Sequence, residues 1–138
     1  MKYSKATNYA LHTMVYLAAQ SQGKAVGVEP LAQKQDLSAT YLSKILTKLV
    51  KAGLIISSPG VKGGYMLAKQ PKHISFLDVI QAIEGQSSLF YCSILHRSPD
   101  EERGCLIEEV MIEAEEQMNV YLREKKLSEI VPKMPSGT

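Results

Sequence analysis

Apolar residues recur every three or four positions in several separate stretches of the chain. The clearest stretch is residues 38–52, where the apolar positions on one helical face are Leu42, Ile45, Leu46, Leu49 and Val50. Ser38 suits the start of this helix because its hydroxyl can accept a backbone N–H of the first turn. Gly53 suits its end because a residue without a Cβ enters the left-handed conformation at little cost. The opposite face is polar and cationic, with Thr40, Tyr41, Lys44, Lys48 and Lys51.

Three further helices and a two-stranded hairpin are predicted around the helix of residues 38–52. Helices are predicted over residues 4–20, 28–35 and 76–84, the last with Ser75 as its N-terminal cap. Short apolar strands are predicted over residues 54–58 and 65–68, joined by the glycine-rich turn 59–64 with Lys62 at its tip. This order predicts a mainly α fold with a small β-wing, a winged helix-turn-helix whose second helix, residues 38–52, reads DNA.

A second apolar stripe lies near the C-terminus and predicts a long helix. Its members are Ile107, Val110, Met111, Ala114, Met118, Tyr121 and Leu122, with glutamates over much of the other faces. Because a domain of 85 residues is too small to cover such a helix, we expect the stripe to pack against a second copy of the chain. The predicted organisation is a DNA-binding domain over residues 1–85, a sensor-like loop over 86–104, a dimerisation helix and C-terminal segment over 105–131, and a disordered tail over 132–138.

Charge is divided unevenly along the 138 residues. Residues 1–75 hold ten lysines and two acidic residues, a balance of +8, whereas residues 76–138 hold six basic and twelve acidic residues, a balance of −6, which together give the net +2. The polarity suits a cationic DNA-reading part joined to an acidic remainder, although lysines also merely solvate helix faces. Two cysteines are too few for a secreted disulfide framework, and no apolar run is long enough to span a bilayer. We expect a cytoplasmic protein without a membrane partner.

The run YLSKILTKLVKAGLI followed by PGVKGGYML resembles the Rrf2 family of bacterial winged-helix transcription regulators. The opening MKYSKATNYALHTMVYLA and the segment ISFLDVIQAIEG resemble it as well. The family includes the iron–sulfur cluster regulator and a nitric-oxide-sensing repressor. The resemblance implies a homodimer, formed through the C-terminal helix, that reads inverted-repeat operators in double-stranded DNA.

Candidate DNA-binding residues follow from the helix and the wing. Four are expected in the major groove: Thr40, Tyr41, Ser43 and Lys44. Lys48 and Lys62 are expected to bind phosphates, and Gly63 and Gly64 to let the hairpin backbone approach the minor groove. The set also includes Ser38 and Tyr65, which border the helix and the wing turn, and Lys2, whose alternative role is a solvated lysine at a frayed terminus. Ser43 replaces a glutamate that the iron–sulfur cluster regulator uses to discriminate between DNA sites, so the same discrimination is not expected.

Cys92, His96 and Cys105 are the candidate sensor residues. In cluster-binding relatives three cysteines precede the dimerisation helix; here the middle one is missing, with His96 or Ser98 near its place, and Asn8 replaces an acidic ligand of the first helix. Three interpretations remain open. The three residues bind a two-iron cluster or another metal with a ligand from the partner subunit, or the cysteines form a disulfide or react with an oxidant, or they are inert and packed.

These observations predict a dimeric DNA-binding transcription regulator that responds to redox, iron–sulfur or nitrosative signals through Cys92 and Cys105. We expect a repressor, and the sequence leaves an activator open. The alternative is a winged-helix adaptor that binds protein and has no DNA target. An enzyme is not expected, because the sequence shows no Ser/His/Asp set and the glycines of GVKGG are not followed by a helix that would cradle phosphate.

Overall fold

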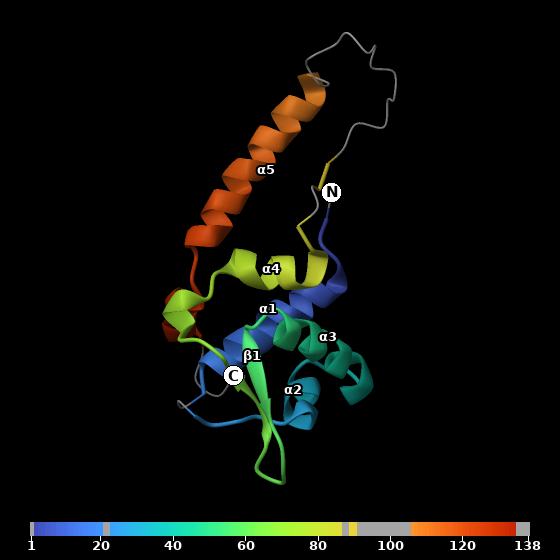
Figure 1. Cartoon of the computed structure of the whole chain (residues 1–138), viewed down its shortest axis with the longest axis vertical. Coiled ribbons are helices and arrows are strands. Elements are labelled where there is room, and N and C mark those ends of the chain that lie inside the picture. The colour runs from blue at the N-terminus through green and yellow to red at the C-terminus, as the bar shows by residue number, and fades with distance from the viewer. Residues whose placement is uncertain (1, 21–22, 87–88, 91–105, 135–138) are drawn as a thin grey trace.

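The DNA-binding part of the molecule begins with three helices, and the β-hairpin of the wing follows them in the chain. The computed structural model describes residues 2–20, 23–86, 89–90 and 106–134, with α1 at Lys5–Ala18, α2 at Val28–Lys34 and α3 at Ala39–Lys51 (Figure 1). The start of α3 is as predicted: the Ser38 hydroxyl accepts a hydrogen bond from the Tyr41 backbone N–H over 3.1 Å. Its end is also as predicted, since Gly53 has a φ of 77°.

The apolar face of α3 forms the centre of the core, with one exception. Leu42, Leu46 and Leu49 are fully buried and pack with residues of α1 and α2. The prediction that Val50 joins them is wrong, because its side chain is 37% exposed. At 3.6 residues per turn Val50 lies about 100° around the helix from Leu49, at the margin of the apolar arc.

The wing is a two-stranded antiparallel hairpin with one further bridge. Strand β1 (Ile55–Ser58) pairs with β2 (Gly64–Leu67) in a register that sets Ile55 opposite Leu67. On its other edge β2 is joined by Val26, which exchanges two backbone hydrogen bonds of 2.8 and 2.9 Å with Tyr65. Strand β2 is therefore hydrogen-bonded along both of its edges at Tyr65.

Helix α4 (Phe76–Glu84) lies across α1 and α3 and follows the short 3₁₀ helix η1 (Pro71–His73). Its predicted cap is confirmed: the Ser75 hydroxyl accepts from the Asp78 N–H, and the Asp78 carboxylate accepts from the Ser75 N–H, both over 3.0 Å. Gly85, with a φ of 81°, ends the helix.

Helix α5 (Leu106–Glu124) extends away from the body of the molecule (Figure 1) and packs against α4. None of its residues is buried. The single apolar stripe expected from the sequence is divided between two sides. Met111, Met118 and Leu122 are half-buried, whereas the exposed members are Ile107, Val110, Ala114 and Tyr121.

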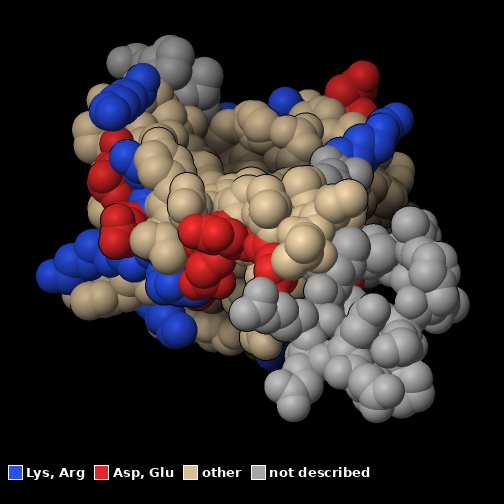
Figure 2. All heavy atoms as spheres, turned by 90° about the horizontal axis from the view of Figure 1, so that it is seen from above, with Lys and Arg blue, Asp and Glu red and all other residues tan. Residues whose placement is uncertain are grey.

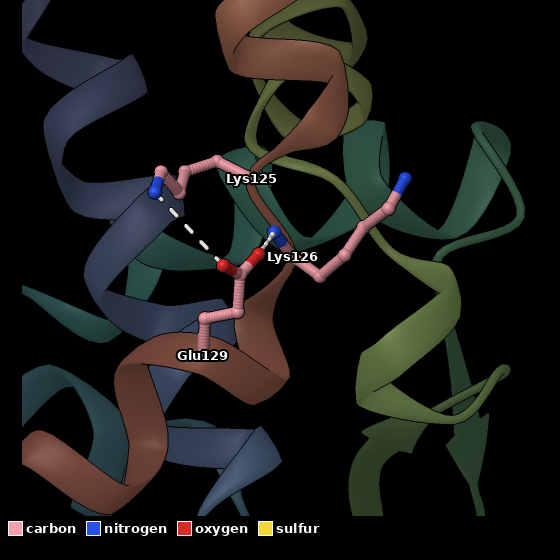
Figure 3. A network of polar contacts seen from close by, with 3 residues as sticks. All are labelled: Lys125, Lys126 and Glu129. Atoms are coloured by element: carbon pink, nitrogen blue, oxygen red, sulfur yellow. Dashed lines mark hydrogen bonds and ion pairs between the residues drawn. The ribbon is translucent and has the colours of Figure 1, made fainter.

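The chain turns sharply after α5 and returns to the core. The Lys125 carbonyl accepts from the Phe76 N–H over 2.9 Å, and the Leu127 N–H donates to the Ile74 carbonyl over 3.0 Å. Glu129 closes the turn by accepting from the Lys126 N–H over 2.7 Å, with the Lys125 ammonium 3.9 Å from its other oxygen (Figure 3). This junction fixes the base of α5 to the start of α4.

The last described elements are α6 (Leu127–Ile130) and the 3₁₀ helix η2 (Val131–Lys133). Leu127 is fully buried in the hydrophobic core, where α6 meets α1, and Ile130 and Met134 pack against the same core. The C-terminal segment therefore contributes to the core of the winged-helix part, and Pro132 and Lys133 belong to η2.

Candidate nucleic-acid interface

The solvent-facing side of α3 presents hydroxyl and ammonium groups. Besides Val50, the exposed side chains of α3 are all polar: Thr40, Tyr41, Lys44, Thr47, Lys48 and Lys51. Ser43 is half-buried, and its carbonyl accepts a 2.9 Å hydrogen bond from the Thr47 hydroxyl. Thr47 was not among the sequence candidates, although its spacing of seven from Thr40 places both on one face of the helix.

Tyr41 is held by a second aromatic ring. Its ring meets that of Tyr9 on α1 edge-on, with 5.9 Å between centroids and an interplanar angle of 88°. The Tyr41 side chain is nevertheless 38% exposed. Its orientation at the N-terminal end of α3 is therefore fixed by α1, a contact that the spacing of residues within α3 does not reveal.

Glu84, the last residue of α4, anchors the N-terminal end of α1. One carboxylate oxygen accepts from the Ser4 N–H over 2.7 Å, from the Ser4 hydroxyl over 3.0 Å and from the Thr7 hydroxyl. Burial acts to raise the pKa of Glu84, but hydrogen bonds from Thr7 and Ser4 and the charge of Lys48 outweigh it and hold that pKa below its ordinary value. The start of α1 and the end of α4 are thus joined at one carboxylate, which also feels the charge of Lys48 on α3.

Tyr3, which precedes Ser4 in the chain, contacts α5. The Tyr3 hydroxyl lies 3.9 Å from the Met118 sulfur, and burial, followed by the charges of Glu115 and Glu84, raises the pKa of Tyr3. Glu115 also accepts a 3.1 Å hydrogen bond from the Leu89 N–H. Lys2, the candidate phosphate contact at this terminus, is exposed.

The wing turn places Lys62 in solvent, beside a fully exposed Val61. The two glycines that follow Lys62 are required because a side chain at either position would overlap backbone atoms of this chain. A Cβ on Gly63 would overlap the Ser58 carbonyl, and a Cβ on Gly64, whose φ is 142°, would lie 2.5 Å from the Val26 backbone. Packing within the hairpin therefore explains both glycines whether or not the turn approaches DNA.

The sensor candidates Cys92, His96 and Cys105 lie outside the described residues. Within the described part of the chain, no group of three His, Cys, Asp or Glu side chains is placed to hold a metal. Asn8, at the position of the helix-1 ligand, is exposed on α1, and its carbonyl lies 2.8 Å from His12 Nδ1. The interpretation of Cys92, His96 and Cys105 as ligands of a cluster or another metal therefore stays a prediction.

Seen from the end at which α5 lies, one group of acidic side chains lies near the middle of the view and others lie at its left and upper right, and lysine and arginine side chains lie mostly toward the margins (Figure 2). Among the described helices, none is both long and apolar enough to cross a membrane.

Comparison with known proteins identifies the fold and the family together. The family model described as Rrf2, an iron-dependent transcriptional regulator, matches residues 3–133. The chain belongs to the Rrf2 family. Within this family it is 33% identical over 135 residues to the HTH-type transcriptional regulator YwgB of Bacillus subtilis, an alignment that covers 97% of this chain and 86% of YwgB.

Solved structures of Rrf2-type regulators share the whole architecture. CymR, the global cysteine regulator of B. subtilis, is 27% identical with a TM-score of 0.79, and the match covers 98% of this chain and 99% of CymR. An oxidised form of CymR from Staphylococcus aureus is 27% identical with a TM-score of 0.78, over 99% of this chain and all of that one. The winged-helix fold and the function of a DNA-binding transcription regulator, both expected from the sequence, are confirmed.

Proposed function

We propose that this Rrf2-family protein is a homodimeric repressor that places α3 in the major groove of each half of an inverted-repeat operator. The observation that carries the proposal is the exposed polar and cationic face of α3, which begins at a well-formed cap and leads directly into the wing. A helix of this kind offers its N-terminal side chains to base edges, and its lysines to phosphates.

Individual roles follow from exposure. The proposed base contacts are Thr40, Tyr41, Ser43 and Lys44, of which Ser43 has the least exposed surface. Lys48, Lys62 and Lys2 are exposed cations and are assigned to phosphates. Ser38 contributes by capping α3, and Tyr65 by joining β2 to Val26.

The phosphate assignment is tested by the salt dependence of binding. Fluorescence anisotropy on a duplex of about three helical turns gives the affinity of the wild type and of Lys48→Ala over a range of salt concentrations. Loss of one phosphate contact lowers the slope of log K against log salt by about 0.9 per protomer. Lys126→Ala, which removes a lysine from the turn between α5 and α6, is the matched control and keeps the slope. An unchanged salt slope in Lys48→Ala would refute the assignment of Lys48 to a phosphate. If the wild type binds none of the duplexes tried, of any sequence, the adaptor function is favoured instead.

The exposed side of α5 supports dimerisation. Ile107, Val110 and Tyr121 are each at least 60% exposed on one helix, and helices of this kind bury such positions against a partner. Light scattering after size exclusion is expected to give a dimer for the wild type and a monomer for Val110→Glu. Glu116→Gln, an exposed polar change on the same helix, is the control and keeps the dimer. A monomeric wild type, or a dimer unaffected by Val110→Glu, contradicts the assignment.

We further propose that the segment holding Cys92 and Cys105 receives the signal as a thiol switch. A peroxide oxidises one thiol to a sulfenic acid and is itself reduced to water; condensation with the second thiol then releases another water and forms a disulfide. The oxidised form of the S. aureus CymR supports this chemistry by similarity only.

An absorbance spectrum of protein purified without oxygen, with iron and sulfide assays, tests the thiol switch against a cluster. A colourless, metal-free protein that loses two free thiols on mild peroxide treatment supports the switch. A brown protein whose visible bands disappear in Cys92→Ala and Cys105→Ala contradicts it and restores the cluster.

A further inference from the structure

A cavity of about 610 Å³, partly open to solvent, lies between the wing and the C-terminal segment. Its walls are the last turn of α1 with Gln20, Gly23 and Lys24 after it, strand β2 with the residues that follow it, η1, and Ser128 of α6. Cavities of this volume are typical of small-molecule sites in proteins. Among the described residues that line it, none is assigned to DNA.

One part of the lining is apolar. Leu17 of α1 is only 4% exposed, and Met66 of β2 and Pro71 of η1 are half-buried. Methionine and leucine side chains at such positions give an adaptable apolar surface, which suits a hydrocarbon or aromatic group. An apolar surface of this kind offers neither charge nor hydrogen-bond donors to DNA phosphates.

The other part of the lining is cationic and lacks compensating acids. Lys24, Lys69 and Lys72 are exposed and belong to the lining of the cavity. Among the described residues that line the cavity there is no aspartate or glutamate. Among the residues that the structure describes, no carboxylate forms an ion pair with any of the three lysines. The combined lining therefore attracts a negative group.

We propose that this cavity binds a small amphipathic carboxylate, with its apolar part against Leu17, Met66 and Pro71 and its carboxylate among the three lysines. Because the walls come from both the wing strand and α6, the occupant contacts the DNA-reading part and the segment that fixes the base of α5. The proposal includes a linkage between this binding and DNA affinity, in which DNA changes carboxylate affinity by the same factor. The linkage rests on the proposed function, whereas the binding itself does not.

The test uses octanoate on the full chain, with octanol and octylamine as matched probes that lack the negative charge. Calorimetry measures affinity, and amide chemical shifts in NMR spectra locate the site. Octanoate is expected to shift the signals of Leu17, Met66 and Ser128 and to bind more tightly than either matched probe. Lys69→Gln combined with Lys72→Gln is expected to weaken octanoate binding about 2- to 30-fold, since exposed charge pairs are individually weak. Lys51→Gln combined with Lys126→Gln removes the same charge elsewhere and leaves the affinity unchanged.

Several results would overturn the proposal. One is octanol binding as tightly as octanoate, and another is an unchanged affinity in the Lys69/Lys72 double variant. A third such result is that octanoate does not bind. If, in addition, the Lys69/Lys72 double variant lowers the slope of DNA affinity against salt, these lysines contact phosphates instead. If octanoate binds but leaves DNA affinity unchanged in a protein that does bind DNA, the linkage is wrong. Failure of the wild type to bind DNA at all would instead contradict the proposed function.

Discussion

Removing the Glu84 carboxylate is expected to loosen the N-terminal end of α1. Glu84→Ala removes the carboxylate, one oxygen of which accepts three hydrogen bonds, from the Ser4 N–H, the Ser4 hydroxyl and the Thr7 hydroxyl. Thr7 is 2% exposed, so its hydroxyl then has neither this acceptor nor water. Glu84→Gln keeps an acceptor oxygen but removes the negative charge that faces the positive end of the α1 dipole.

The size of the loss follows from these contacts. A buried hydroxyl without an acceptor costs about 1–3 kcal/mol, and loss of an N-terminal cap costs about 0.5–2 kcal/mol. Because Ser4 is exposed and regains water, we expect Glu84→Ala to lower the free energy of unfolding by about 2–3 kcal/mol. Glu84→Gln is expected to lower it by about 1 kcal/mol, the charge-dependent part. Urea unfolding followed by circular dichroism, at one fixed protein concentration, measures both.

The same anchor predicts a pH dependence. The pKa of Glu84 is lower in the folded chain than its ordinary value of 4.5. The advantage of the wild type over Glu84→Gln is therefore complete above pH 4.5 and declines as the pH falls below 4.5 through the folded pKa. Glu116→Ala, at an exposed glutamate of α5, is the control and changes stability by less than about 0.5 kcal/mol. A loss below about 0.5 kcal/mol in Glu84→Ala, or a difference from Glu84→Gln that does not shrink in acid, would refute the reasoning.

Two further predictions concern the wing and the C-terminal segment. Gly64→Ala is expected to cost more than Gly53→Ala, because both have positive φ but only the Cβ at Gly64 meets backbone, 2.5 Å away; the strain alone is about 1–2 kcal/mol, and equal losses in thermal unfolding would contradict the clash. Leu127→Ala is expected to lower the free energy of unfolding by about 2–5 kcal/mol, since Leu127 is fully buried in the core; a loss within about 0.5 kcal/mol in urea unfolding would show that α6 does not belong to the folded unit.

Much of the winged helix could be predicted because its signals are local. Ser38, Gly53 and Ser75 each mark a helix end through hydrogen bonds or backbone freedom within a few residues, and each has the expected conformation. The paired strands follow from a glycine-rich turn between short apolar runs. Val50 was misplaced because apolar periodicity defines an arc of the helix but not how far the neighbouring elements cover it.

The features that could not be predicted depend on tertiary contacts. Nothing near Glu84 in the sequence indicates that it binds Ser4 and Thr7, 80 and 77 residues away. Leu127 looks like one more apolar residue after a long helix, yet the turn at Lys126 returns it to the core. The periodicity of α5 likewise could not show that its stripe divides between α4 and solvent.

Selection of DNA by the protein itself tests the central claim most directly. The full chain is incubated with sheared genomic DNA of its own source, and the retained fragments are sequenced, in parallel with a variant that carries Thr40→Ala and Lys44→Ala. The account predicts enrichment of a two-fold symmetric motif whose half-sites are centred about one helical turn, or a multiple of it, apart, and loss of that motif in the variant. Enrichment of no motif, or a motif that the α3 variant selects equally well, would contradict the account.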